Sequence, residues 1–211
     1  MKAVYHSFWL LVVFSMASCE KPLIKTGSII GVVKDATTGE PIANADVFLM
    51  QNEIGDGDIW NGGGPSEQID YTTSDANGNF SFLFDYDKDY RYLCGAEKSL
   101  YFDLNQEFSV DEDTKNGNNV EVLLNPVAWL NIYLLDAEPY MEEHELRLSP
   151  FESLITLNAY SVDTNILGSV NGNCNRNFIW VLENLSTGDL QSEELNIYCP
   201  SFDTTYYEIL Y

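Results

Sequence analysis

Hydrophobic and polar positions alternate along most of this chain, with the period of two residues that is typical of half-buried β-strands. The alternation is clear at 45–49 (ADVFL) and 79–84 (NFSFLF). Short apolar runs recur roughly every 8 to 12 residues, separated by Gly, Asn, Asp and Pro, as in β-sandwiches. No stretch after residue 27 has the 3.6-residue period of an amphipathic helix. We therefore expect an all-β protein.

The predicted strands form two groups, one on each side of Pro126. The first group comprises 28–35, 45–51, 68–74, 79–84, 89–95, 98–103 and 119–125, and the second 127–135, 145–149, 153–160, 165–170, 176–183, 193–199 and 204–210. Because proline cannot donate a hydrogen bond to a β-ladder, we expect Pro126 to break the strand pattern. The sequence thus predicts two β-sandwich domains, 27–125 and 126–211, with a very short linker between them.

The N-terminal segment has a different pattern. Lys2 is followed by an apolar run at 8–16 and then by Ala17, Ser18 and Cys19. This order resembles a bacterial lipoprotein signal, which implies removal of residues 1–18 and attachment of lipid to Cys19. The apolar run is shorter than the ~20 residues that a membrane-spanning helix needs. We expect residues 19–26 to tether a cell-envelope protein to the outer membrane, on its periplasmic or its surface face.

Composition restricts the partners. The chain has 10 basic and 33 acidic residues, a net charge of −23. Such a charge repels nucleic-acid phosphates and anionic lipid headgroups, so no nucleic acid is expected as a partner, and membrane contact is expected through the N-terminal lipid. The hydrophobic fraction of 45% is too high for a disordered tail.

The first domain resembles a known family. Residues 27–50 (GSIIGVVKDATTGEPIANADVFLM) and 71–84 (YTTSDANGNFSFLF) are similar to the carboxypeptidase regulatory-like domain, a transthyretin-like sandwich of seven strands. The resemblance covers about 27–125 and implies an accessory module without catalytic activity. Asn77 and Gly78 are typical of a tight hairpin turn with positive φ at both residues. The second domain resembles no family that we can name.

A glycine-rich insertion at 52–67 departs from this family pattern. Trp60 is its large aromatic residue and Asp58 lies beside it. Because binding residues on rigid scaffolds tend to lie in loops, these two residues are candidate contacts for a sugar ring or a protein partner. The alternative is that Trp60 folds back and anchors the loop.

Catalytic and metal-binding patterns are weak. A zinc peptidase needs two or more histidines and a serine triad needs a histidine held by a carboxylate, whereas His144 is the only histidine after the signal segment. We therefore predict no catalytic residue and no cofactor. Asp85, Asp87 and Asp89 alternate as weak calcium candidates, but they lack the glycine and glutamate of an EF-hand loop. A solvated strand end is the favoured interpretation, and no metal site is predicted.

The remaining cysteines and tryptophans lie in predicted strands. Cys174 and Cys199 of the second domain are candidates for a disulfide in an oxidising compartment, and the alternative is that they are small buried side chains. Trp129 and Trp180 have apolar neighbours, so we expect both in the core.

These observations favour a non-catalytic, lipid-anchored envelope protein that acts as a binding or assembly module, with a protein or a glycan as partner. The main alternative is a purely structural accessory subunit of an outer-membrane complex. A third hypothesis is a hydrolase that uses paired carboxylates, which a chain with 33 acidic residues can place close together by chance.

Overall fold

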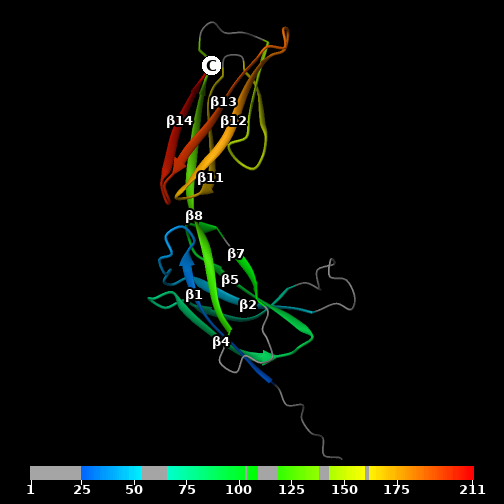
Figure 1. The fold of residues 1–211 in the computed structure, drawn as a ribbon, viewed down its shortest axis with the longest axis vertical. Coiled ribbons are helices and arrows are strands. Elements are labelled where there is room, and N and C mark those ends of the chain that lie inside the picture. Colours follow the sequence, from blue (N-terminus) through cyan, green and yellow to red (C-terminus); the bar gives the residue numbers. More distant parts are fainter. Residues whose placement is uncertain (1–24, 54–65, 103, 109–117, 138–142, 160–161) are drawn as a thin grey trace, which may run out of the picture.

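The computed structural model describes residues 25–53, 66–102, 104–108, 118–137, 143–159 and 162–211 (Figure 1). These residues form β-strands, turns and loops, which confirms the predicted all-β fold. No helix in these segments is long and apolar enough to cross a membrane.

Most strands lie within a few residues of their predicted positions. In chain order they are β1 (Lys25–Asp35), β2 (Asp46–Glu53), β3 (Glu67–Thr73), β4 (Asn79–Tyr86), β5 (Tyr90–Glu97), β6 (Tyr101–Phe102), β7 (Leu104–Phe108), β8 (Asn118–Leu135), β9 (His144–Leu148), β10 (Ile155–Asn158), β11 (Asp163–Asn171), β12 (Cys174–Asn184), β13 (Leu190–Cys199) and β14 (Thr204–Leu210).

The first sandwich packs two sheets face to face. One contains β4, β1 and the first half of β8, and the other has the order β3-β2-β5-β7. Alternate residues of these strands point inward, as the period of two predicts. The inward side chains form one hydrophobic core, whose fully buried members include Ile29, Val33, Val47, Leu49, Tyr92, Val122 and Leu124.

The second sandwich has the same construction. Its sheets are β11-β8-β14 and β10-β9-β12-β13. A separate hydrophobic core lies between them and includes Leu130, Ile132, Leu134, Leu146, Leu148, Trp180 and Cys199. In Figure 1 this sandwich lies above the first, and β8 runs through both.

The expectation that Pro126 breaks the strand pattern is wrong, because Pro126 lies inside β8, a continuous strand of 18 residues. The parallel ladder with β1 ends at Leu124, and the antiparallel ladder with β11 begins at Val127. Pro126 therefore lies between these two ladders and opposite Tyr101 of β6, where the amide of Val127, and not that of Pro126, is the donor to Leu100. The chain has no linker at this point, since one strand changes partners there.

Residues 98–100 of the strand predicted at 98–103 belong to a turn. The amide of Tyr101 donates to the carbonyl of Lys98 at 3.0 Å, and Leu100 has a positive φ of 71°. Of the described residues in this range, Tyr101–Phe102 form a strand, β6. The sequence pattern also missed β7, which pairs with β5 at the edge of its sheet.

The Asn77-Gly78 turn connects two sheets and not two paired strands, contrary to the prediction. β3, before it, pairs with β2, whereas β4, after it, pairs with β1. Gly78 has a φ of 75°, but Asn77 is not among the residues with positive φ. The carboxylate of Asp75 stabilises the turn by accepting from the amides of Asn77 and Asn79, each at 2.8 Å.

The two tryptophans differ in position. Trp180 is 3% exposed and belongs to the second core, as predicted. Trp129 is only half-buried, and its neighbours Ala128 and Leu130 are fully buried. Because adjacent strand residues face opposite ways, Trp129 lies on the outer face of its sheet, and the core prediction is wrong for it.

Two glycines of the first sandwich allow a matched test of the turn. Gly39 and Gly78 both have φ of 75°, but a Cβ on Gly39 would meet no atom within 4 Å, whereas one on Gly78 would lie 2.6 Å from the carbonyl oxygen of Val33. We expect Gly39→Ala to lower the free energy of unfolding by about 1 kcal/mol through backbone strain. Gly78→Ala should cost about 2 kcal/mol or more, because β1 must also shift. Urea unfolding of both variants measures this, and equal losses would contradict the close approach.

Candidate functional site

Three of the candidate site residues predicted from the sequence lie outside the described residues. These are Cys19, Asp58 and Trp60. Lipid attachment and recognition by the 52–67 loop therefore stay predictions.

The alternating aspartates lie at the turn between β4 and β5. Asp85 is exposed on β4, and the carboxylate of Asp87 accepts a hydrogen bond from the amide of Asp89 at 3.0 Å. Asp87 thus stabilises its own turn. Within the segments that the structure describes, no three His, Cys, Asp or Glu side chains are grouped so that they could hold a metal ion.

The two cysteines of the second sandwich lie directly opposite each other. Cys174 on β12 is the cross-strand partner of Cys199 on β13, an arrangement that places Cβ atoms about 4.5–5.5 Å apart. Both are free thiols in this structure, and they donate to the carbonyls of Asn171 and Ile197. The register brings the pair together, and the disulfide itself stays a prediction. Cys94 lies in the first core, where burial raises its pKa to about 12.

The region around Pro126, where the two sandwiches meet, is called the junction below. Three turns reach the same point of β8: the amide of Val127 donates to Leu100, that of Gly172 to Pro126, and that of Phe202 to Val127, at 2.7–2.8 Å. These turns come from both sandwiches. The residues around Pro126 are therefore held on several sides by backbone hydrogen bonds.

This junction also has strained backbone. Leu100, Asn173 and Phe202 have φ of 71°, 53° and 62°, in the left-handed region that non-glycine residues rarely adopt. Each such residue costs on the order of 1 kcal/mol, which the surrounding contacts must offset. One of these contacts is the edge of the Tyr101 ring against Phe202, with ring centroids 5.3 Å apart.

A buried carboxylate organises the side of the junction that belongs to the first sandwich. Asp35 is 5% exposed at the end of β1. Its Oδ1 accepts from the amide and hydroxyl of Thr37 and from the amide of Thr38, and its Oδ2 accepts from the Tyr101 hydroxyl. Burial raises the pKa of Asp35, but these hydrogen bonds outweigh it and hold the pKa below 3.8. Burial and the Asp35 charge raise the pKa of Tyr101 to about 12.

Asp35 and the residues that donate to its carboxylate, Thr37, Thr38 and Tyr101, are called the Asp35 group below. This group also connects the two sandwiches. The Thr37 hydroxyl, held by Asp35, accepts a hydrogen bond from the amide nitrogen of the Asn173 side chain at 3.0 Å. The other end of that side chain accepts from the amide of Ser201, also at 3.0 Å. Asp35 therefore positions a contact that joins the top of β1 to two turns of the second sandwich.

A cleft of about 510 Å³ opens at this junction. Its walls come from both sandwiches and carry two aromatic rings and two charges of opposite sign. The lining residues are Phe102, Phe151, Glu152, Ser169, Val170, Asn171 and Arg176. Volumes of this size are typical of small-molecule sites, which often lie at domain interfaces.

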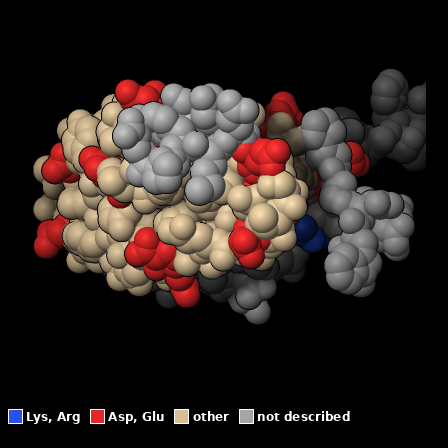
Figure 2. All heavy atoms as spheres, turned by 90° about the horizontal axis from the view of Figure 1, so that it is seen from above, with Lys and Arg blue, Asp and Glu red and all other residues tan. Residues whose placement is uncertain are grey.

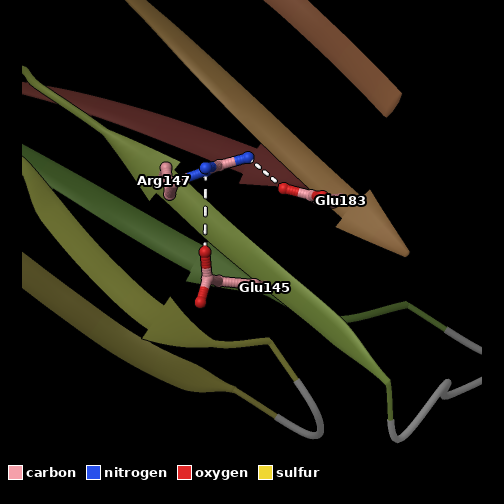
Figure 3. Close-up of polar contacts among 3 residues, drawn as sticks. All are labelled: Glu145, Arg147 and Glu183. Atoms are coloured by element: carbon pink, nitrogen blue, oxygen red, sulfur yellow. Dashed lines mark hydrogen bonds and ion pairs between the residues drawn. The ribbon is translucent and has the colours of Figure 1, made fainter. Parts of the chain in front are cut away.

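A different group of charges lies on the second sandwich (Figure 3). Arg147 on β9 forms ion pairs with Glu145 on the same strand and with Glu183 on β12. All three side chains are about one-third exposed, so the pairs contribute little to stability. His144, the histidine after the signal segment, is half-buried beside Asn184.

The end of the molecule formed by the second sandwich is acidic. Figure 2 views the molecule from this end and shows Asp and Glu side chains spread over the surface, with few basic side chains in view. This distribution agrees with the net charge of −23. An anionic macromolecule would be repelled from this end.

Comparison with known proteins identifies no family. No family model matches the chain, and no curated protein does. The resemblance of residues 27–125 to the carboxypeptidase regulatory-like domain therefore stays an expectation.

Several solved structures are similar to parts of the chain. The C-terminal domain of the shaft pilin SpaA from Lactobacillus rhamnosus GG is 19% identical, with 48% of this chain and 98% of that domain covered and a TM-score of 0.34. The minor pilin GBS52 of Streptococcus agalactiae is 12% identical, with 87% and 94% covered and a TM-score of 0.35. The Bacillus anthracis TIE protein is 10% identical, with 88% of this chain but 34% of that protein covered and a TM-score of 0.35. Identities and TM-scores are low, and the function proposed below rests on the geometry of this chain.

The junction cleft was not predicted from the sequence. Its aromatic and charged residues, Phe102, Phe151 and Arg176, are far apart along the chain and belong to no motif. One signal was present: the alternation that buries Phe178 and Trp180 places Arg176 on the same, inward face of β12. A basic residue on a core-facing position indicates a special environment.

The Asp35 group predicts a specific pH dependence. Because its pKa is lower in the folded chain, the stabilisation is present above about pH 3.8 and is lost as the pH falls through the folded pKa. We expect Asp35→Asn to lower the free energy of unfolding by about 2 kcal/mol at pH 7, since hydrogen bonds to a charged group are lost. Urea unfolding between pH 7 and pH 2.5 should show the wild type approaching the variant below pH 3.8.

Asp85→Asn is the matched control, because it removes the same charge from an exposed position. It should change stability little at any of these pH values. A difference between wild type and Asp35→Asn that is constant with pH would show that the Asp35 charge does not stabilise the junction.

Proposed function

We propose that this chain is a lipid-anchored, non-catalytic module of the cell envelope that holds its second sandwich away from the membrane and presents it to a partner. The observation that carries this proposal is the continuous strand β8. Its 18 residues extend about 60 Å at the usual rise per residue and belong to a sheet of each sandwich. A shared strand restricts bending between the sandwiches more than a flexible linker would.

The direction of β1 supports the proposed orientation. β1 pairs with β8 in parallel, from Ile29 opposite Asn118 to Asp35 opposite Leu124. Lys25 therefore lies at the end of the first sandwich that is remote from the second (Figure 1). Lys25 is six residues after Cys19, a distance of at most about 22 Å along an extended chain. A lipid on Cys19 would place the first sandwich beside the bilayer and the second sandwich farther out.

The outer face of the β11-β8-β14 sheet is the surface that best suits a partner. Leu167, Asn131 and Tyr206 stand side by side across its three strands. Leu167 is 62% exposed and Tyr206 is 75% exposed, and the half-buried Trp129 lies on the same face. Aromatic rings interspersed with amides suit a protein or a glycan. The loop at 52–67, with Trp60 and Asp58, is the alternative surface.

Lipid attachment is the first prediction of this proposal. Cys19 should become the N-terminal residue and carry two or three acyl chains, because it follows the apolar segment and the small residues Ala17 and Ser18. Intact-mass spectrometry of the chain from detergent-solubilised membranes checks this. A chain that retains Met1, or an unmodified Cys19 in a soluble fraction, would contradict the anchor.

The second prediction is that the first sandwich lies closer to the bilayer than the second. Leu83 lies opposite Ser28, near the tethered end, whereas Leu190 lies opposite Glu183, at the far end of the second sandwich. Both side chains are exposed, 73% and 66%, and suit fluorophores introduced as unnatural amino acids. In vesicles that contain a headgroup quencher, the lipidated chain should be quenched several-fold more at 83 than at 190.

A flexible insertion tests the role of β8 in this arrangement. Gly-Ser-Gly-Ser between Asn125 and Pro126 should reduce the difference in quenching, because it separates the two ladders of β8. The same insertion in the exposed turn between Ser186 and Thr187 is the control and should preserve it. Equal quenching at both positions of the wild type would refute the proposed orientation.

A further inference from the structure

The junction cleft has a cation, Arg176, that forms no ion pair with any described residue. Arg176 is half-buried on the inward side of β12 and lines the cleft. Its Nε donates to the carbonyl of Pro150 at 2.6 Å. The ion pairs formed within the described part of the chain involve Lys34 and Arg147, and none involves Arg176. In a chain with 33 acidic residues, a partly buried arginine that no described carboxylate neutralises is unexpected.

Two neighbouring residues, Cys199 and Glu152, do not neutralise the positive charge of Arg176. Cys199 lies near Arg176, but burial raises the pKa of its thiol more than the arginine lowers it, so the thiol is neutral at pH 7. Glu152 also lines the cleft, but this residue is exposed, and the ion pairs of the described residues do not include one between Glu152 and Arg176. Among the described residues, no carboxylate pairs with the terminal nitrogens of Arg176, which leaves them for an external anion.

The aromatic wall beside Arg176 is preformed. The Phe151 ring packs onto Gly168 of β11 so closely that a Cβ there would lie 2.5 Å from the ring. The hydrogen bond from Arg176 to Pro150 fixes the residue before Phe151. The guanidinium and the ring are thus held by the same short segment. Phe102, from the first sandwich, supplies a second apolar surface.

We propose that the junction cleft binds a small monocarboxylate with an apolar ring, whose carboxylate pairs with Arg176 and whose ring packs against Phe151 and Phe102. Guanidinium and carboxylate form the strong, charge-assisted pair that fits this geometry. Glu152 and the acidic surface disfavour ligands with a second negative charge. This small-molecule site borders the partner surface proposed above, because Ser169 lines the cleft and lies opposite Trp129, but the proposal does not depend on that surface.

Isothermal titration calorimetry of the full chain with 3-phenylpropionate tests the site. We expect saturable binding that Arg176→Gln weakens at least about tenfold, because the charged pair is lost. Arg91→Gln removes the same charge from an exposed position of the first sandwich and should bind like the wild type. Phenyl phosphate, which carries nearly two negative charges at pH 7.5, should bind more weakly than 3-phenylpropionate.

A second variant tests the aromatic wall while keeping the charge of Arg176. It separates specific binding in the cleft from nonspecific attraction of the ligand to that charge. Gly168→Ala leaves Arg176 in place but displaces the Phe151 ring, so it should weaken binding several-fold. Melting temperatures from the same samples show whether each variant is folded. Binding that is unchanged in folded Arg176→Gln or Gly168→Ala, or no saturable binding up to 10 mM ligand, would overturn the proposal. The membrane orientation is tested by fluorescence quenching and the carboxylate site by calorimetry, so either proposal can fail without the other.

Discussion

The structure depends on one strand that satisfies its backbone hydrogen bonds in two sheets. The first half of β8 pairs with β1, and its second half lies between β11 and β14. Each half contributes alternate residues to a different core, so neither core forms fully without it. A strand buried in this way cannot bend freely without breaking ladder hydrogen bonds. The relative position of the two sandwiches thus follows from backbone hydrogen bonding.

The junction shows what this arrangement requires. Changing partners within one strand leaves turns on both sides that must meet at Pro126 and Val127. Leu100, Asn173 and Phe202 adopt strained backbone there, and the Asp35 group fixes the adjoining turn of the first sandwich. The backbone strain at these three residues is local, and several hydrogen bonds of the junction surround it. Features of this kind cluster at functional sites, and the cleft with Arg176 opens at the same place.

The local pattern predicted most strands but not their partners. Alternation is a property of neighbouring residues, so 79–84 and 204–210 were recognised from the chain itself. Pairing of β1 with β8, or of β8 with β14, joins residues far apart in the sequence and has no local signal. The same limit explains why Asn77-Gly78 suggested a hairpin and why the cleft was missed. Pro126 was misinterpreted because a missing donor breaks a strand only where a ladder needs that donor.

The parallel pairing of β1 with β8 has a mechanical consequence. Tension applied between Lys25 and the second sandwich would pull the start of β1 and the end of β8 in opposite directions along the strands. The seven residue pairs of this ladder would then be loaded together, in shear, and would not open one after another. Rupture under force is governed by the unfolding rate, and simultaneous loading raises the barrier that sets this rate. A chain anchored at its N-terminus and gripped at its far end would bear load through the strand that contributes to both cores.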